Sequence, residues 1–437
     1  MFSYNLWLSW LSLRRTPILS TLTVAAIGIG IAVCMTIITV YTLMANDPVP
    51  SRSDRLYTYQ LDNHLTVTED QELDDPNELA SYRDVIALMA SDIPADQSVH
   101  YQTSAVFKPD NPDIKPFRSR LRLATPGFFR MFDVPFLYGN PWSEDDESEA
   151  RQVMIIDRDL NDRLFGGRDS IGERVMMGER YFEVVGVTDT FSPIPRYFEI
   201  DGGSFSDTEG AYIPFSLTPV LQLRKSGGST MCLDDPQGDS YQAFLDADCN
   251  WLHHWVELPT VGDREAYMAL LDNYALEQRQ YGRFQGPFRN RLHDVMSWLE
   301  YREVMNPAYL MLLGIAFMFL AVCLLNTNGL LFAKFTGRAG DISVRRALGC
   351  SRKRMFAQHL VEVGVVGVLG GVLGLVIAAV NLFALREMFP NFDNLAHLNL
   401  ELVLVAIALS LGSTLLAGLY PAWKMCRVPP ATYLKSH

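Results

Sequence analysis

The sequence predicts an α-helical membrane protein with four transmembrane helices and a large α+β extracytoplasmic domain between helices 1 and 2. Three observations predict this fold class: four long apolar runs, a polar segment of about 260 residues after the first run, and basic residues beside the runs. A helix crosses a bilayer with about 20 apolar residues, and each run is at least that long. The runs are residues 18–45, 308–333, 356–385 and 402–423.

The four runs carry almost no ionisable side chains. Only the third contains any, His359 and Glu362, both near its start. Paired charges inside the membrane are typical of ion-coupled carriers, and Glu362 is the sole candidate for such a role. The first run is longer than the roughly 7–15 apolar residues of a signal peptide, so we interpret it as a retained anchor.

The basic residues predict the orientation. Arg14 and Arg15 precede the first run, a dense group of Lys and Arg residues lies between the second and third runs, and three more follow the fourth. The protein's net charge is −13, yet these three segments are all positive. Because Lys and Arg are enriched in cytoplasmic loops, we expect a multi-pass membrane protein with both termini in the cytoplasm.

These signals divide the chain into nine predicted segments. They are an interfacial helix at 1–17, the first span at 18–45, an extracytoplasmic domain with a stalk at 46–305, the second span at 306–333, a basic cytoplasmic segment at 334–355, the third span at 356–386, a short loop at 387–400, the fourth span at 401–423 and a cytoplasmic tail at 424–437. Trp7 and Trp10 favour an interfacial position for the first helix; a simple extension of the first span is the alternative.

The segment 46–305 has the mixed pattern of an α+β domain. Strands are expected at 152–156, 174–177 and 180–187, and helices at 81–89, 157–165 and 263–280. An amphipathic helix at 290–305 is expected to lead straight into the second span as a stalk. We interpret residues 191–255 as an irregular insertion and the acidic run 144–147 as a solvated loop.

Two cysteines of the six lie in the predicted extracytoplasmic segment, Cys232 and Cys249. An isolated pair in an oxidising compartment predicts a disulfide. It would stabilise its loop by about 3 kcal/mol in the chain-entropy model. Two free thiols are the alternative.

Four motifs follow one another along the chain. They are TPGFFRMFDVPFLYG at 125–139, LFGGRDSIG at 164–172 with FEVVGV at 182–187, GDISVRRALGCSR at 340–352, and GLYPAW at 418–423. With the layout of one span, an external domain and three more spans, they resemble permeases of the MacB type, a group that also includes lipoprotein-release permeases and the cell-division permease FtsX. The resemblance covers nearly the whole chain. Asp341 stands where the family commonly has Glu, and residues 429–434 depart from the family's usual tail.

The resemblance implies that the segment between the second and third spans docks on an ATPase. The residues are suited to this because they combine charge with an apolar side, and Gly349 can end a short helix. The candidate coupling residues are Asp341, Ile342, Val344, Arg345, Arg346, Ala347, Leu348 and Gly349. The alternative is that the basic residues only follow the usual charge distribution of membrane proteins.

Small residues recur at helical spacing in two spans. They are Gly364, Gly367, Gly370, Gly371 and Gly374 in the third span and Gly28 in the first. Pairs four residues apart allow a neighbouring helix to approach closely, either within the chain or across a subunit interface. The resemblance implies a dimer, with a second copy or with a sibling permease.

No phosphate-binding G-x-x-x-x-G-K-[ST] motif occurs in the sequence. We therefore expect no catalytic residues and no cofactor in this chain, with ATP and Mg²⁺ bound by a separate ABC ATPase subunit. His253 and His254 lie near Cys249, but adjacent residues of a strand point to opposite faces, so no metal site is expected. No nucleic-acid partner is expected either.

The resemblance implies a permease that converts ATP hydrolysis by its partner into movement of the external domain. This movement would drive export of periplasmic cargo, with a periplasmic adaptor and an outer-membrane channel as candidate partners. Extraction of lipoproteins or lipids from the inner membrane is one alternative. Regulation of a periplasmic hydrolase is another.

Overall fold

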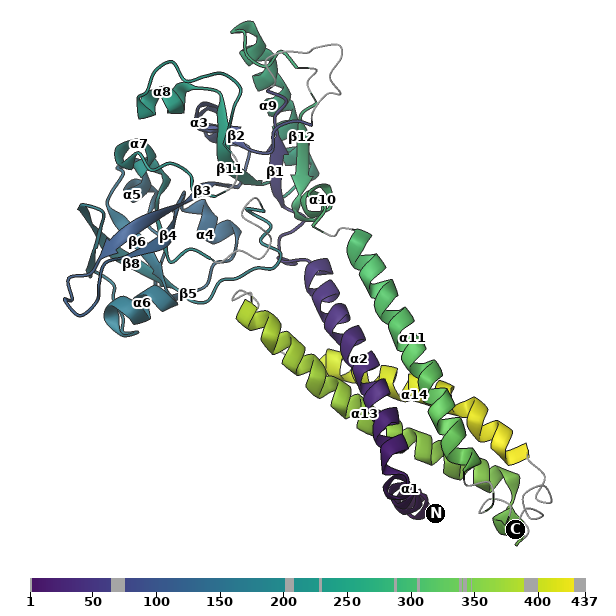
Figure 1. Cartoon of the computed structure of the whole chain (residues 1–437). Coiled ribbons are helices and arrows are strands. Elements are labelled where there is room, and N and C mark those ends of the chain that lie inside the picture. The colour runs from purple at the N-terminus through teal and green to yellow at the C-terminus, as the bar shows by residue number, and fades with distance from the viewer. Residues whose placement is uncertain are drawn as a thin grey trace. The chain divides into compact units, whose positions relative to one another are not determined.

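Long apolar helices and a large β-sheet separate into two units in the computed structural model of the chain (Figure 1). The structure describes residues 2–63, 75–200, 208–227, 230–286, 289–304, 307–337, 340, 344–346, 348–388 and 400–427. One unit comprises Met1–Asn46 and Met305–His437, and the other comprises Asp47–Val304.

The helical unit contains four helices that are long and apolar enough to cross a membrane. They are α2 (Pro17–Ala45), α11 (Pro307–Thr336), α13 (Arg352–Met388) and α14 (Leu400–Arg427). Each predicted apolar run lies within one of them. Helix α13 packs against α2 and α14, and α11 packs against the same two helices (Figure 1). Buried side chains such as Ile27, Ile31 and Leu320 fill the space between them.

A separate helix precedes the first candidate span. Helix α1 (Phe2–Arg15) ends where Thr16 leaves the helical conformation, and Pro17 begins α2, since proline is tolerated in the first turn of a helix. Ser12 on α1 is buried against the bundle, while Trp7 and Trp10 are exposed. This break argues against a simple extension of the first span; the interfacial position of α1 stays a prediction.

The second unit is built on a 12-stranded mixed sheet. Its main path runs β12-β1-β11-β3-β4-β9-β6-β8-β5, with β2, β7 and β10 paired beside it. The β4–β9 and β6–β8 pairs are parallel and the other pairs are antiparallel. The strands are β1 (Leu56–Gln60), β2 (Ala80–Ser81), β3 (Asp96–Lys108), β4 (Phe117–Ala124), β5 (Phe136–Gly139), β6 (Val153–Asp157), β7 (Arg174–Met177), β8 (Arg180–Thr188), β9 (Ala211–Pro214), β10 (Met231–Cys232), β11 (Cys249–Glu257) and β12 (Arg291–Asp294).

Short helices accompany the sheet. They are α3 (Tyr82–Met89), α4 (Gly127–Met131), α5 (Glu144–Ser148), α6 (Arg158–Phe165), the 3₁₀ turn η1 (Phe215–Leu217), α7 (Thr218–Leu221), α8 (Tyr241–Asp246), α9 (Val261–Gln280) and α10 (Val295–Tyr301). The predicted strands at 152–156, 174–177 and 180–187 and the helices at 81–89, 157–165 and 263–280 are confirmed within one or two residues. Gly166 ends α6 in a left-handed conformation, as its position after the helix suggests.

Three sequence expectations are wrong. Residues 291–294 form β12 rather than the start of a stalk helix, because they pair with β1 at the edge of the sheet. The supposed irregular insertion contains β9, α7, α8 and the fully buried strand β11. The acidic run forms the short helix α5 rather than a loop, although Glu144 and Asp145 are solvent-exposed as expected. Glu147 accepts hydrogen bonds from the Trp142 indole N–H at 2.8 Å and the Ser216 N–H at 2.7 Å. Burial raises the pKa of Glu147 to about 7.

Candidate coupling site

The turn between α11 and α13 exposes apolar and basic side chains. Residues 344–346 are helical, and the Leu348 N–H donates to the Val344 carbonyl at 3.0 Å. Gly349 then adopts a φ of +95°, which favours glycine and ends the turn. Leu348 is 83% exposed and Val344 is 48% exposed. Arg345 is exposed too, and its guanidinium lies 3.4 Å from the Gln358 amide oxygen on α13.

Five of the eight predicted coupling residues therefore belong to one described turn. The other three, Asp341, Ile342 and Ala347, lie outside the described residues. Arg346 is half-buried, so the exposed surface of the described turn consists mainly of Val344, Arg345 and Leu348.

An apolar cluster joins the ends of α11 and α13 beside this turn. Its buried members are Leu331, Phe335, Met355 and Val363, with Cys350 and Phe356 packed against them. At the start of α13, the Ser351 hydroxyl accepts the Arg354 N–H at 3.3 Å, which satisfies one free donor of the first turn. The exposed turn is thus carried on a packed helical hairpin.

Four helices meet at a buried polar junction next to the hairpin, formed by Ser12, Ser20, Lys334, His359 and Glu362. The Lys334 ammonium of α11 lies 2.8 Å from Glu362 Oε1 of α13, with side chains 1% and 5% exposed. Ser12 of α1 donates to Glu362, and Lys334 donates to the Ser20 hydroxyl of α2 at 3.3 Å. His359 Nδ1 lies 3.8 Å from Glu362 Oε2.

The polar junction is a structural feature that the sequence analysis does not predict. The sequence indicates Glu362 as the sole candidate for a charge with a role inside the spans, whereas Lys334 is only one of the basic residues between the second and third runs. One sequence feature could have predicted this pair: a basic residue at the end of the second apolar run and an acidic residue near the start of the third. Such charges are costly in an apolar environment unless they are paired.

Glycines bring α13 close to both of its neighbours. A Cβ added at Gly370 or Gly374 would lie within 3.0 Å of atoms of α2, including Ile27 and the Gly28 carbonyl. A Cβ at Gly367 or Gly371 would lie as close to the hydroxyl groups of α14, and the Ser410 hydroxyl donates to the Gly367 carbonyl at 2.6 Å. Gly364 has nothing within 4 Å of an added Cβ. These contacts lie within one chain; a use at a subunit interface stays a prediction.

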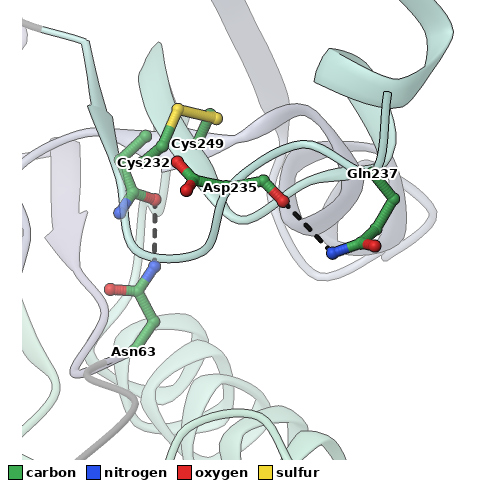
Figure 2. Close-up of a disulfide and its surroundings, with 6 residues drawn as sticks. Asn63, Cys232, Asp235, Gln237 and Cys249 are labelled. Carbon is green, nitrogen blue, oxygen red and sulfur yellow. Dashed lines mark hydrogen bonds between the residues drawn. A yellow bond between two sulfur atoms is a disulfide. The ribbon is translucent and has the colours of Figure 1, made fainter. Parts of the chain in front are cut away.

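A disulfide joins Cys232 and Cys249 in the second unit (Figure 2). The two residues face each other across the β10–β11 pair, where β10 is exposed and β11 is buried. Beside the disulfide, the Asn63 amide donates to Asn250 Oδ1 at 2.9 Å (Figure 2). The bond therefore fastens a surface segment to a central strand.

A second buried ionic group, the arginine–glutamate cluster, comprises Arg122, Arg196, Glu199 and Glu209. Arg122 donates to Glu199 and, at 2.6 Å, to Glu209; Arg196 donates to the same two acids. All four side chains are at most 3% exposed. Burial raises the pKa of Glu199, but the two guanidinium groups outweigh burial and hold that pKa well below its usual value.

His253 and His254 lie in different environments on β11. His254 contacts the Tyr59 hydroxyl at 2.8 Å and the Gln97 side chain at 3.2 Å, whereas His253 stacks on His100. Burial lowers the pKa of His254 to about 3. Among the described residues, no group of three His, Cys, Asp or Glu side chains is placed to hold a metal ion.

Comparison with known proteins identifies two family domains. Residues 20–246 match the family model of the MacB-like periplasmic core domain, and residues 313–430 match that of the FtsX-like permease C-terminal domain. The uncharacterized ABC transporter permease YvrN of Bacillus subtilis is 24% identical over 309 residues, which cover 70% of this chain and 68% of that protein.

Two proteins named as export ATP-binding/permease proteins are also similar. The macrolide export ATP-binding/permease protein MacB of Syntrophobacter fumaroxidans is 23% identical over 344 residues, covering 71% of this chain and 46% of that protein. The pyoverdine export ATP-binding/permease protein PvdT of Pseudomonas entomophila is 25% identical over 312 residues, covering 71% of this chain and 42% of that protein. The chain thus matches less than half the length of each.

Two solved structures resemble part of the chain. The periplasmic region of MacB from Actinobacillus actinomycetemcomitans covers 58% of this chain and 95% of its own at 14% identity and a TM-score of 0.36. The extracellular domain of YknZ from Gram-positive bacteria covers 55% and 98% at 12% identity and a TM-score of 0.33. Because the periplasmic core model alone matches more than half of the residues, the chain belongs to the family of MacB-like ABC transporter permeases.

Proposed function

We propose that this permease transmits the movement of a separate ABC ATPase to its own extracytoplasmic domain, without hydrolysing ATP itself. The observation that carries this proposal is the exposed turn between α11 and α13. Leu348 and Val344 present apolar surface there, outside the apolar parts of the spans, and Arg345 adds a positive charge. Exposed apolar side chains within a charged rim are typical of a protein–protein contact.

The distribution of charge supports an orientation with this turn in the cytoplasm. Arg14 and Arg15 end α1, Arg345 and Arg346 lie in the turn, and Lys424 lies near the end of α14. With four spans, these three places lie on one side of the membrane, and basic residues favour the cytoplasmic side. The proposed location is the bacterial inner membrane, with both termini in the cytoplasm.

The proposed assembly contains two permeases and the ATPase. ATP and Mg²⁺ bind to the ATPase, and the second permease is another copy or a sibling chain. Two similar proteins are named as exporters of macrolides and of pyoverdine, which supports export of a periplasmic cargo as the process that this movement drives. A periplasmic adaptor and an outer-membrane channel belong to the same proposal.

Affinity purification of the full chain from membranes, with the co-purifying proteins identified by mass spectrometry, tests the proposal. We expect an ATP-binding-cassette ATPase with the wild-type chain and at least a tenfold lower recovery with Leu348→Asp, because an acid would disrupt an apolar contact. Val261→Asp is the matched control, since Val261 is an exposed apolar residue, 59% exposed, in the other unit.

Two results would contradict the proposal. The first is wild-type chain that purifies without any ATPase. The second is equal recovery of the ATPase with Leu348→Asp and with wild type, which would show that the turn is not the docking surface.

A further inference from the structure

The two spans that continue directly into the extracytoplasmic domain are α2 and α11. Helix α2 ends at Ala45, and the domain begins at Asp47; the domain ends at Val304, and α11 begins at Pro307. Helices α13 and α14 have no such connection, because both follow α11 in the chain. The main chain connects the helical unit to the domain only through α2 and α11. A movement of the turn that is passed on through the main chain must therefore displace one or both of these helices.

The polar junction contacts both of these spans at a single ion pair. Lys334 is two residues from the end of α11, and its ammonium lies 2.8 Å from Glu362 on α13. The same ammonium donates to Ser20 on α2 at 3.3 Å, and Ser12 on α1 donates to Glu362. One pair thus joins α1, α2, α11 and α13 near the C-terminal end of α11.

The pair also closes the base of the hairpin that carries the turn. All residues of the turn lie between Lys334 and Glu362 in the chain, and the apolar cluster around Phe335 and Met355 packs the two helices on the side of the turn. The hairpin, one arm of which is α11, is thereby attached as a unit to α2.

The chemistry of the pair makes this attachment stiff. Both charged groups are almost fully buried, so separating them would leave each charge without water. The glycine contacts of α13 with α2 and α14 are mostly van der Waals contacts, which are individually weak and have no preferred direction. A buried, directional ion pair instead fixes its helices at one height relative to one another.

We propose that Lys334 and Glu362 form the joint that holds α11 and α13 together and attaches them to α2, so that movement of the turn passes to both spans that lead to the extracytoplasmic domain. Both act as positioning residues, since neither lies in the exposed docking surface. This inference rests on the proposed function and names the residues that carry its transmission step.

The test uses the full chain with its co-purified ATPase in lipid nanodiscs. Hydrogen–deuterium exchange is measured for residues 43–56 and 299–312, where the spans join the domain, with and without Mg²⁺ and a non-hydrolysable ATP analogue. The variants are Lys334→Met, Glu362→Gln and the exchanged pair Lys334→Glu with Glu362→Lys. Ser410→Ala is the matched control, because it removes a buried hydrogen bond between α14 and α13 without touching the pair.

We expect the nucleotide to change exchange in wild type and in Ser410→Ala. In both single variants this change should fall at least fivefold while the ATPase remains bound. The exchanged pair should restore more than half of the change, because serine hydroxyls can donate or accept a hydrogen bond and suit either orientation of the charges. If a single variant fails to fold, the exchanged pair tests the proposal by itself, because it keeps both charges and their pairing.

Three results would each contradict the proposed role of the ion pair. They are a wild-type nucleotide-dependent change in exchange in Glu362→Gln, no such change in a folded exchanged pair, and a loss of this change in Ser410→Ala as large as in the single variants. In those cases the ATPase is still bound and the proposed function stands. Wild-type chain that recovers no ATPase, or that binds it without any nucleotide response, overturns the proposed function and the joint together.

Discussion

Gly374 of α13 lies against the main chain of α2 at Gly28: a Cβ at Gly374 would come within 2.9 Å of the Gly28 carbonyl oxygen. The Ile31 side chain lies equally close on the same side. The opposing backbone cannot move away from an added methyl group without separating the helices. Gly364, ten residues earlier on α13, meets no atom within 4 Å.

This contrast predicts opposite effects of the same substitution. We expect Gly374→Ala to destabilise the bundle by about 1–3 kcal/mol, because overpacking forces side chains and backbone to shift. Gly364→Ala should be neutral or slightly stabilising, since alanine favours helix over glycine by up to about 1 kcal/mol. Thermal unfolding of the full chain in detergent measures both, and equal midpoints for the two variants would contradict the prediction.

The spacing of these glycines could be predicted from the sequence, but their partners could not. A separation of four residues places Gly370 with Gly374, and Gly367 with Gly371, on two helical stripes. Which helix faces each stripe depends on the packing of the whole bundle. The structure assigns one stripe to α2 and the other to α14.

The disulfide gives a second prediction. Cys232 and Cys249 are separated by 17 residues, and a loop of that size predicts a loss of about 3 kcal/mol when the bond is removed. We therefore expect Cys232→Ser to lower the free energy of unfolding of the second unit by roughly that amount. Trp251 of β11 can report it, because the buried indole packs on Phe244 of α8, inside the closed loop.

Reductant provides the control for this prediction. Reduced wild type should unfold at the midpoint of Cys232→Ser, whereas the variant should not respond to reductant. Cys350→Ser, which changes a free cysteine, should leave the midpoint unchanged. A midpoint of Cys232→Ser equal to that of oxidised wild type would show that the disulfide does not stabilise the fold.

The arginine–glutamate cluster predicts a large effect from a single charge. Arg122→Leu leaves Glu199 and Glu209 buried with only one guanidinium between them, which should cost about 3–5 kcal/mol. Arg168→Ala breaks the Arg168–Glu173 pair, whose side chains are 61% and 40% exposed, and should cost less than about 1 kcal/mol. Urea unfolding of the full chain, followed by tryptophan fluorescence, compares the two. Similar losses would mean that the buried cluster adds no special stability.

Ionic groups are the part of the molecule that sequence patterns predict least. The four spans, three strands of the domain (β6, β7 and β8) and three of its helices (α3, α6 and α9) follow from local periodicity. The pairs Lys334–Glu362 and Arg122–Glu209 join residues 28 and 87 positions apart, and no local pattern connects them. The edge strand β12 was missed for a related reason, since its pairing with β1 depends on residues more than 200 positions away.

The environment of His254 predicts a specific pH dependence. Burial lowers the pKa of this histidine from 6.5 to about 3, so the folded domain binds fewer protons there than the unfolded chain does. The stability that neutral His254 provides is therefore present above pH 6.5 and is lost as the pH falls toward 3. Between pH 7 and pH 5 the loss should be about 2 kcal/mol.

A comparison with His254→Gln isolates this contribution, since glutamine does not titrate but can still bond to Tyr59. Glu147 and Asp157, whose pKa burial raises to about 7, titrate in the opposite sense, but they are present in both proteins and cancel. We expect the free energy of unfolding of wild type, relative to the variant, to fall by about 2 kcal/mol from pH 7 to pH 5. A difference that stays constant over this range would show that His254 titrates equally in the folded and unfolded chain.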